Sequence, residues 1–286
     1  MKTLVIGDVH GHLDRLEALL KQEGIIGECP ICHGTGDYQR PSATEPGMCL
    51  KCNGVGISRI NHDVEVVQLG DLGHYGIDTV TADRLTWEYA PKWIDVILWG
   101  NHDRAVIEKG HHFGGYANPD GQTKDAIDAA ITEGKLKLAY EAHGFLLTHA
   151  GLHSEFQHNK IPSLLKTSPK LFAEWLNECD IRGADDPPPE YTNDFRAIRD
   201  NISPLRGAHF RADGGILWRD AREPLYDGFK QVFGHTSRDE DVTRTYPADD
   251  GLSYCIDVGN QYNGRLKGLW LPEERVVEIH LKEDQR

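Results

Sequence analysis

Short apolar segments recur along the chain and alternate with longer amphipathic stretches. Five of the apolar segments lead directly into a polar motif: TLVIG, VEVVQLG, DVILWG, FLLT and QVFG. Apolar runs of this length that stop at glycine are typical of buried strands. The segment HLDRLEALLKQEG instead has the periodicity of an amphipathic helix, with one side formed by Leu13, Leu16, Leu19 and Leu20. The alternation predicts an α/β fold.

The same reading predicts the other regular elements. We expect helices in DTVTADRLTWEYA, TKDAIDAAITEG, FAEWLNEC and DFRAIRDNI, and further strands in SYCIDVG, LKGLWL and RVVEIHL. The stretch KLKLAYEAHGFLLTHAGL predicts a hairpin that turns at His143 and Gly144. Proline keeps the loop DDPPPE out of a helix.

Polar residues follow the apolar segments where the strands are expected to end. They are Asp8, His10, Asp71, Asn101, His102, His149 and His235. In an open α/β sheet, ligands bind at the carboxyl ends of the strands. We therefore expect six of these side chains, all except His102, to meet at one edge of one sheet and to form a metal site.

The types of donor atom indicate which metals bind and what they do. Mixed nitrogen and oxygen donors suit manganese, iron, zinc or cobalt better than calcium, and we expect manganese, with iron, zinc, cobalt or nickel as alternatives. Two ions about 3.5–4 Å apart clamp a phosphoryl group for in-line displacement. They deprotonate a bridging water and neutralise the developing charge. Asp71 is well placed to bridge two such ions.

His102 and Asp103 follow Asn101 directly and are expected to have a different task. His102 cannot easily bind an ion while its neighbour Asn101 does. It is better used as the acid that protonates the leaving oxygen. Asp103, the next residue, is expected to orient His102.

Four of the six cysteines form two CxxC pairs, each of which continues as CxxCxGxG; they are Cys29, Cys32, Cys49 and Cys52. Doubled CxxC pairs predict one structural zinc ion held by four thiolates. The glycines let the chain turn back, so that backbone amides can point at the sulfurs. The alternative is two disulfides, which a reducing cytoplasm disfavours. The repeat resembles the zinc-binding units of the J-domain co-chaperones over about thirty residues.

This predicted zinc knuckle occupies residues 27–60, as an insertion between the first helix and the second strand of one domain that spans residues 1–286. The other two cysteines, Cys179 and Cys255, are expected to be small core or surface residues.

Composition limits the classes of partner. The 286 residues carry a formal net charge of −14, from 45 acidic and 31 basic residues. A duplex-binding protein would usually have a basic patch, so we expect no unspecific binding of nucleic acid. No apolar stretch approaches the length of a membrane span, and the N-terminal apolar run is too short for a signal peptide. We therefore expect a cytoplasmic protein with no membrane partner.

The motifs GDVHGH, LGDLG, WGNHD, THAGL and FGHT, in this order, resemble those of the calcineurin-like metallophosphoesterases. The resemblance is greatest to the branch that contains the phosphoprotein Ser/Thr phosphatases and the symmetrical diadenosine tetraphosphate hydrolases. It covers nearly the whole chain outside the zinc knuckle and residues 155–200, and it implies an αββα sandwich. It also implies that the first ion is bound by Asp8, His10 and Asp71. The second ion would be bound by Asp71, Asn101, His149 and His235.

The sequence also departs from the pattern of that branch. Where the phosphatases have GDxxDRG, this chain has GDLGHYG, with His74 and Tyr75 in place of the later Asp and Arg. Trp99 replaces the Arg that often precedes GNH. The resemblance implies a phosphate-binding arginine upstream of the LW segment, which here is Arg206. An arginine fork suits a pair of phosphoryl oxygens. The alternatives for this role are Arg104 and Arg219.

These observations together predict a metal-dependent phosphoesterase that acts on a phosphorylated small molecule, a nucleotide or a phosphoprotein by metal-activated hydroxide. One alternative is a phosphodiesterase or nuclease with the same clamp, although FGHT lacks the later histidine of GHxH that is usual in the nuclease-like branches. Another is a scaffold that docks a protein partner through the zinc knuckle, although a scaffold does not need His102. Asp257, at a further strand end, is either a partner of a metal ligand or a turn residue.

Overall fold

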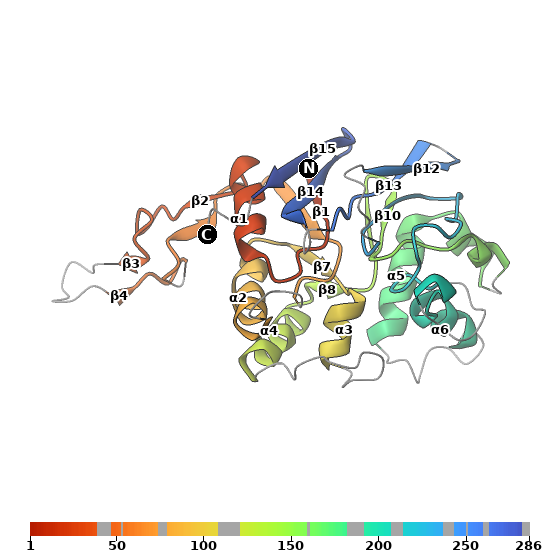
Figure 1. Ribbon diagram of the computed structural model, residues 1–286, viewed down its shortest axis with the longest axis horizontal. Coiled ribbons are helices and arrows are strands. Elements are labelled where there is room, and N and C mark those ends of the chain that lie inside the picture. Colours follow the sequence, from red (N-terminus) through yellow and green to blue (C-terminus); the bar gives the residue numbers. More distant parts are fainter. Residues whose placement is uncertain are drawn as a thin grey trace.

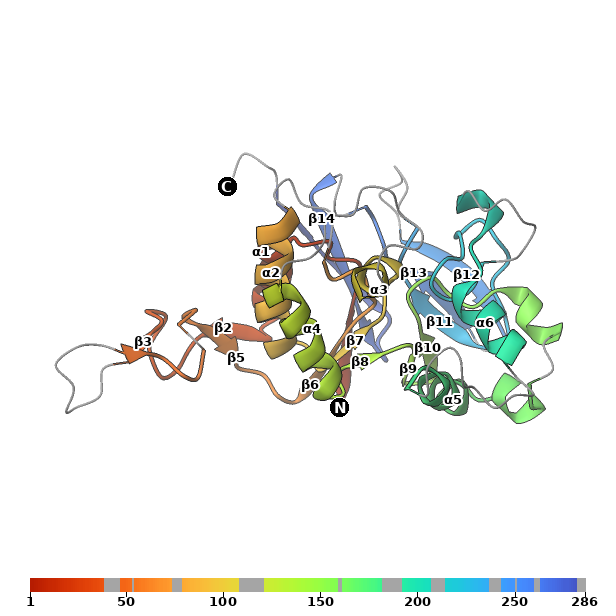
Figure 2. The ribbon, with the colours of Figure 1, turned by 90° about the horizontal axis from the view of Figure 1, so that it is seen from below.

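The fold is known from a computed structural model. It describes residues 1–38, 47–52, 54–73, 79–107, 121–158, 161–181, 192–206, 214–236, 243–249, 251–259 and 263–281. Two β-sheets pack face to face in the middle of the body, with helices outside them (Figures 1 and 2). The expected αββα sandwich is therefore confirmed.

The larger sheet has six strands in the order β15-β14-β1-β6-β7-β8. Their bounds are β1 Lys2–Ile6, β6 Val64–Gln68, β7 Val96–Leu98, β8 Leu136–Lys137, β14 Arg265–Leu271 and β15 Arg275–His280. Strands β1, β6, β7 and β8 are parallel, whereas β14 is antiparallel to β1 and to β15. The carboxyl ends of β1, β6 and β7 therefore lie side by side.

The smaller sheet has five strands in the order β12-β13-β11-β10-β9. Their bounds are β9 Tyr140–Ala142, β10 Phe145–Leu147, β11 Lys230–Phe233, β12 Arg244–Ala248 and β13 Gly251–Cys255. Strands β10, β11 and β13 are parallel, and β9 and β12 are antiparallel edge strands. Strands β9 and β10 form the expected hairpin, with positive φ at both His143 and Gly144.

A layer of apolar side chains fills the space between the two sheets. Val5, Val67 and Leu98 come from the larger sheet, and they share one buried cluster with Phe145 and Val232 of the smaller sheet. The two sheets therefore bury their inner faces against each other, which holds their strand ends in a fixed relation.

Helices cover the outer faces (Figure 2). The longer ones are α1 Leu13–Gln22, α2 Thr79–Tyr89, α4 Gly121–Thr132, α5 Pro169–Ile181 and α6 Thr192–Asp200. Shorter helical segments are α3 Asn101–Ile107, η1 Ala90–Lys92, η2 Ser154–His158, η3 Ser163–Lys166 and η5 Pro204–Arg206. Helix α1 contacts β14 and β15, and α5 contacts β9 and β10, so the two sheets have separate helical layers. The five helices expected from the sequence lie in α1, α2, α4, α5 and α6.

The predicted zinc knuckle forms an arm that projects from the body, at the left of Figure 1. The arm contains two small antiparallel sheets, made of β2 Ile26–Glu28 with β5 Ile57–Arg59 and of β3 Asp37–Tyr38 with β4 Gly47–Met48. Its two ends meet at the body, because the amides of Ile60 and Asn61 both donate to the carbonyl of Ile25. Across the described residues, no helix combines the length and apolarity needed to cross a bilayer.

Candidate metal centre and zinc knuckle

The predicted metal ligands come from the ends of strands in both sheets. Asp8, Asp71 and Asn101 follow β1, β6 and β7 of the six-stranded sheet. His149 and His235 follow β10 and β11 of the five-stranded sheet. The expectation that all six side chains share one edge of one sheet is therefore wrong. The local pattern of an apolar run followed by a polar residue is the same in both sheets, so it cannot tell them apart.

Backbone strain concentrates at these positions. Three of the predicted ligands have positive φ, at 50° for His10, 53° for Asp71 and 69° for His235. This region is sparsely populated by residues with a side chain, and it persists only where the surrounding structure enforces it. Each of these residues lies in the turn that follows its strand.

Two glycines make room for the carboxylates. A β-carbon at Gly100 would lie 2.0 Å from Oδ1 of Asp71, and one at Gly234 would lie 2.0 Å from Oδ1 of Asp8. Neither clash can be relieved easily, because both carboxylates are almost fully buried. Gly100 of WGNHD and Gly234 of FGHT therefore cannot carry a side chain, because Asp71 and Asp8 of other motifs pack directly against them.

One group of donor atoms surrounds His149. Its Nε2 lies 2.8 Å from Oδ1 of Asn101, 3.0 Å from Nδ1 of His235 and 3.4 Å from Oδ2 of Asp71. Its Nδ1 lies 2.9 Å from the carbonyl oxygen of Leu69. With Nδ1 donating to Leu69, Nε2 presents a lone pair to the other donors, which is the usual arrangement of a metal-binding histidine.

A second group lies on the other side of Asp71. Nε2 of His10 is 3.9 Å from Oδ2 of Asp71 and 3.9 Å from Oδ2 of Asp8, and Nε2 of His102 is 3.8 Å from Oδ2 of Asp71. Asp71 thus belongs to both groups, as a bridging ligand would. The geometry would also admit His102 as a ligand on this side, an alternative that the sequence reasoning set aside.

Burial and mutual repulsion perturb the charges of this cluster. Burial, and then the nearby Asp257 and Asp71, raise the pKa of Asp8 well above its usual value. Burial acts to lower the pKa of His149, but the Asp71 carboxylate outweighs it and raises that pKa. Burial, and then His149, lower the pKa of His235 well below its usual value. Carboxylates packed this closely in a low dielectric require a positive partner.

Buried polar atoms without hydrogen-bond partners indicate that cations fit between the donor groups around Asp71. Oδ1 of Asp8 and Nε2 of His235 are both buried and have no hydrogen-bond partner among the described residues. Both atoms can donate a lone pair, and both belong to residues of the donor groups around Asp71. The donor set of carboxylate, amide and imidazole groups is therefore suited to two divalent cations of the borderline type.

His102 and Asp103 lie in the first turn of helix α3, which begins at Asn101. His102 lies near the donor groups, with its ring 5.2 Å from the ring of His10, and burial lowers its pKa. The Asp103 carboxylate accepts from the amides of Leu72 at 3.0 Å and Gly100 at 3.1 Å, which tie the two ligand-bearing loops together. Burial raises the pKa of Asp103 to about 7. This loop-anchoring contact had no signal in the sequence, and the expected orientation of His102 by Asp103 stays a prediction.

The candidate arginines differ in their surroundings. Arg206 donates to the carbonyl of His235 at 3.2 Å and to Oγ1 of Thr236 at 2.7 Å. It also forms an ion pair with Asp220 at 3.3 Å, and its side chain remains 28% exposed. It therefore lies next to a predicted ligand and can still reach a substrate. Arg219 is fully buried and donates to the carbonyls of Ala150 and Glu223. Arg104 forms an ion pair with Asp180.

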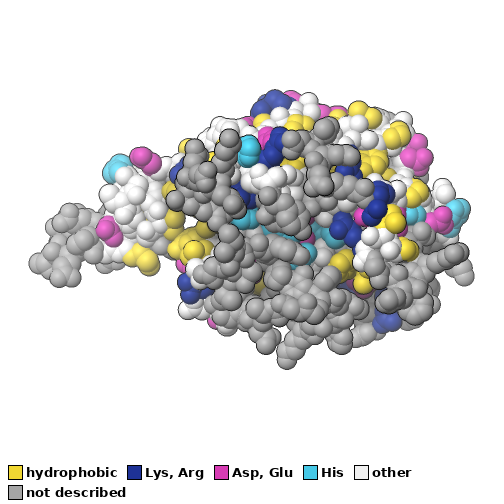
Figure 3. Space-filling model, in the orientation of Figure 1, with side chains coloured by type: hydrophobic (Ala, Val, Ile, Leu, Met, Phe, Trp, Pro, Cys, Tyr) yellow, Lys and Arg dark blue, Asp and Glu magenta, His cyan; other side chains and the backbone are white. Residues whose placement is uncertain are grey.

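Histidine side chains gather in the middle of the face drawn in Figure 3, with lysine or arginine side chains nearby. His74 and Tyr75, which replace the Asp and Arg of GDxxDRG, lie outside the described residues.

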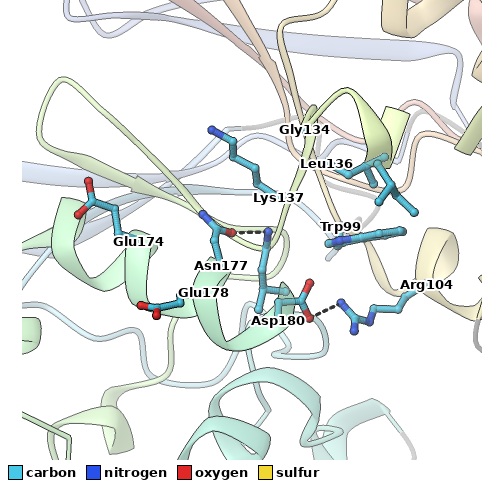
Figure 4. Close-up of a pocket in the computed structure, with 11 residues that line it drawn as sticks. Trp99, Arg104, Gly134, Leu136, Lys137, Glu174, Asn177, Glu178 and Asp180 are labelled. Carbon is cyan, nitrogen blue, oxygen red and sulfur yellow. Dashed lines mark hydrogen bonds and ion pairs between the residues drawn. The ribbon is translucent and has the colours of Figure 1, made fainter. Parts of the chain in front are cut away.

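A cavity of 680 Å³ that includes none of the predicted metal ligands is lined in part by Trp99 (Figure 4). Trp99, Arg104 and Asp180 lie on one side of it, and Glu174 and Glu178 of α5 lie on the other. The Arg104–Asp180 ion pair, at 2.8 Å, neutralises the arginine that borders it. The lining carries three acidic side chains, those of Glu174, Glu178 and Asp180, against two basic ones, Arg104 and Lys137. This excess of negative charge makes the cavity poorly suited to a phosphoryl group.

The four paired cysteines meet in the projecting arm. All of them are buried and none is in a disulfide; Sγ of Cys29 is 3.8 Å from that of Cys49, and Sγ of Cys32 is 3.6 Å from that of Cys52. A tetrahedral zinc site with bonds of about 2.3 Å has sulfur–sulfur edges of about 3.8 Å. The arm thus has the spacing of a four-thiolate site, and the disulfide alternative does not describe this structure.

The glycines of the repeat explain the shape of the arm. Gly34, Gly36, Gly54 and Gly56 all have positive φ. A β-carbon at Gly36 would lie 2.1 Å from the carbonyl oxygen of Gly54, and one at Gly56 would lie 2.2 Å from that of Gly34. The two halves of the repeat therefore touch through their glycines, and the amide of Gly56 donates to Sγ of Cys52 at 3.3 Å.

Comparison with known proteins identifies the family. A family model described as calcineurin-like phosphoesterase matches residues 1–256. The chain belongs to this family. Among curated proteins no match was found. Among solved structures, one described as "a putative diadenosine tetraphosphatase" matches 99% of this chain and 94% of its own, with 18% identity and a TM-score of 0.45. The family implies a hydrolase that acts on phosphate esters and contains a dinuclear metal site.

Proposed function

We propose that the protein is a dinuclear metal-dependent phosphoesterase of the phosphatase type, which hydrolyses a phosphate ester or phosphoanhydride. The position of Asp71 carries this proposal. Its carboxylate lies 3.4 Å from Nε2 of His149 and 3.8–3.9 Å from Nε2 of His102 and His10, so that one residue serves two donor groups. That arrangement suits a bridging ligand between two ions.

The two ions are assigned to the two sides of Asp71. Asp8, His10 and Asp71 would hold the first, and the second would be held by Asp71, Asn101, His149 and His235. Manganese is proposed for both positions, because the donors are mixed nitrogen and oxygen. When bound, such ions activate a water and neutralise the charge of the phosphoryl oxygens.

The chain's own residues would complete the reaction. His102 is proposed to protonate the leaving oxygen, because it is next to the donor groups and its side chain is 12% exposed. Arg206 is proposed to bind the phosphoryl oxygens, because its guanidinium is next to His235 and is partly exposed. Asp103 would fix the loops of Asp71 and Asn101 relative to each other. Its carboxylate accepts from the amides of Leu72, Gly73 and Gly100.

The proposed substrate is a phosphorylated small molecule, a nucleotide or a phosphoprotein. The zinc knuckle is proposed to hold one structural zinc ion, which four thiolates saturate, and to influence substrate access or the docking of a protein partner. Thiolates remain reduced in the cytoplasm, which is the compartment proposed for the protein.

The test compares p-nitrophenyl phosphate with bis-p-nitrophenyl phosphate in the presence of added manganese. Hydrolysis of the monoester alone is the expected result. Turnover of the diester would instead indicate a phosphodiesterase or nuclease with the same clamp. No turnover of either ester, together with retained zinc, would indicate a docking scaffold. The Asp71→Asn variant is the control that excludes a contaminating phosphatase.

A further inference from the structure

One buried carboxylate near the metal centre has no assigned role. Asp257 follows β13, as His149 and His235 follow β10 and β11 of the same sheet. It is 7% exposed, and its Oδ1 accepts from the amide of Gly259 at 2.8 Å. Its Oδ2 is buried, and no described residue forms a hydrogen bond with it. The turn to Gly259 explains only one of its two oxygens, and a buried unsatisfied oxygen is costly.

Backbone contacts place Asp257 beside the predicted ligands. Within the sandwich, a β-carbon at Gly7 would lie 3.2 Å from the carbonyl oxygen of Ile256, so the residues that precede Asp8 and Asp257 are in contact. The amide of Ile256 donates to the carbonyl of Phe233 at 2.9 Å, which joins this strand end to the one that leads into His235. Asp257 therefore lies at the junction between the two sheets, next to Asp8.

The charges of His149 and Arg206 favour the ionised form of Asp257, but neither residue forms an ion pair with it among the described residues. Some other acids in the described ranges form ion pairs with arginine, as Asp220 does with Arg222 and Asp180 does with Arg104. No ion pair involves Asp257 within those ranges, and its charge contributes to raising the pKa of Asp8. Two carboxylates held together in the interior repel each other, and a cation between them would offset that repulsion.

We propose that Asp257 is a further donor to the first ion, and that it supplies its free Oδ2 on the side of Asp8. The inference rests on the proposed dinuclear centre, in which the first ion has three protein donors and the second has four. With Asp257, the first ion would have four protein donors, as many as the second. The ion would also account for the unsatisfied oxygens of both Asp8 and Asp257.

The experiment is a manganese titration of protein from which the active-site metals have been removed, with zinc counted separately by elemental analysis. The variant is Asp257→Asn, which keeps an oxygen for the Gly259 amide and removes the charge. We expect two manganese ions in the wild type. In the variant, we expect affinity at one of the two positions to fall by more than the roughly 10- to 100-fold that loss of an outer partner costs. The other position and the zinc content should be unchanged.

Thermal melts separate a metal ligand from a merely structural residue. Without manganese, Asp257→Asn should melt at or above the wild-type temperature, because it removes a buried uncompensated charge. With saturating manganese, its increase in melting temperature should be smaller than that of the wild type. Asp180→Asn is the matched control, since that acid is paired with Arg104 and Arg199, and it should leave manganese affinity unchanged.

The outcomes remain distinguishable. If Asp257→Asn binds both manganese ions with wild-type affinity and shows the wild-type increase in melting temperature, the inference about Asp257 is wrong and the dinuclear centre stands. If the wild type itself binds no manganese, the proposed function fails. Asp257→Ser, whose hydroxyl can also accept from the Gly259 amide, replaces the Asn variant if that protein does not fold.

Discussion

The protein contains two candidate metal sites that are built in opposite ways. The donors of the zinc knuckle lie within one short segment, from Cys29 to Cys52, and the site closes around itself on a projecting arm. The donors of the metal centre come from strand ends across the whole sandwich; the amide of His235, for example, donates to Oδ2 of Asp8 across 227 positions of sequence. A saturated local site stabilises the arm, whereas a site assembled from both sheets is available for chemistry.

Asp71→Asn should separate the two sites most strongly. It removes the charge shared by both donor groups, so manganese content and turnover of p-nitrophenyl phosphate should both fall, the rate by more than about 100-fold. Zinc content, measured by elemental analysis in the same sample, should remain at one per chain. Loss of zinc together with manganese would mean that the two sites are not independent.

His102→Asn tests the chemistry without removing the proposed ligands. We expect both manganese ions to remain and the rate on a poor leaving group to fall by roughly 100- to 10,000-fold, the usual contribution of a general acid. The loss should be smaller for p-nitrophenolate, which leaves without a proton. Equal losses for good and poor leaving groups would exclude the acid role. Loss of one manganese would instead make His102 a ligand.

Arg206→Lys is expected to have an intermediate effect. A lysine keeps the charge and loses the fork geometry, so KM for the phosphate ester should rise more than kcat falls. Arg219→Lys is not a useful comparison, because Arg219 is a buried structural residue. Arg104→Lys is the better control, and steady-state kinetics should show little change. A larger effect at Arg104 than at Arg206 would reverse the proposed assignment.

Removal of the arm should have the smallest effect on chemistry. Replacing residues 27–60 with a short Gly/Ser linker is feasible, because the amide of Asn61 already donates to the carbonyl of Ile25. Manganese-dependent turnover of p-nitrophenyl phosphate should stay within a few-fold of the wild type. A folded deletion variant that binds manganese but has no activity would show that the knuckle takes part in catalysis.

Substitution of two thiolates is the milder form of the same test. The double variant Cys29→Ser, Cys52→Ser should lose about one zinc per chain while both manganese ions remain, since the two donor sets share no residue. Elemental analysis of the purified protein measures both metals at once. Simultaneous loss of all metal would show that the knuckle was wrongly assigned.

Much of the fold follows from local patterns in the sequence. The apolar runs before Asp8 and Asp71 correctly predict buried strands, and the leucines of α1 predict a helix packed on a sheet. Strand β12 was not predicted, because Pro247 interrupts its pattern; it is tolerated at the edge of the five-stranded sheet. The residue pattern also does not predict how the strands divide between two sheets, because strand pairing depends on contacts between residues far apart in the sequence.

The candidate site, like the fold, is predicted by the sequence only in part. The order of the motifs indicates which side chains gather, and the structure brings Asp71, Asn101 and His149 within a few ångströms of one another. The amide contacts of Asp103 and the free oxygen of Asp257 depend on how loops from different strands meet. No spacing in the sequence encodes such contacts, so they appear only once the sandwich is assembled.

Division of the donors between the two sheets also has a thermodynamic consequence. The second ion, held by Asp71 and Asn101 of one sheet and by His149 and His235 of the other, would act as a cross-link of the sandwich. A first ion that also bound Asp257 would be a second cross-link. Ligands that bind only the folded state stabilise it by mass action, by about 2.7 kcal/mol at a free concentration of 100 times Kd. The supply of manganese would then set the fraction of the protein that is folded as well as the rate at which it works.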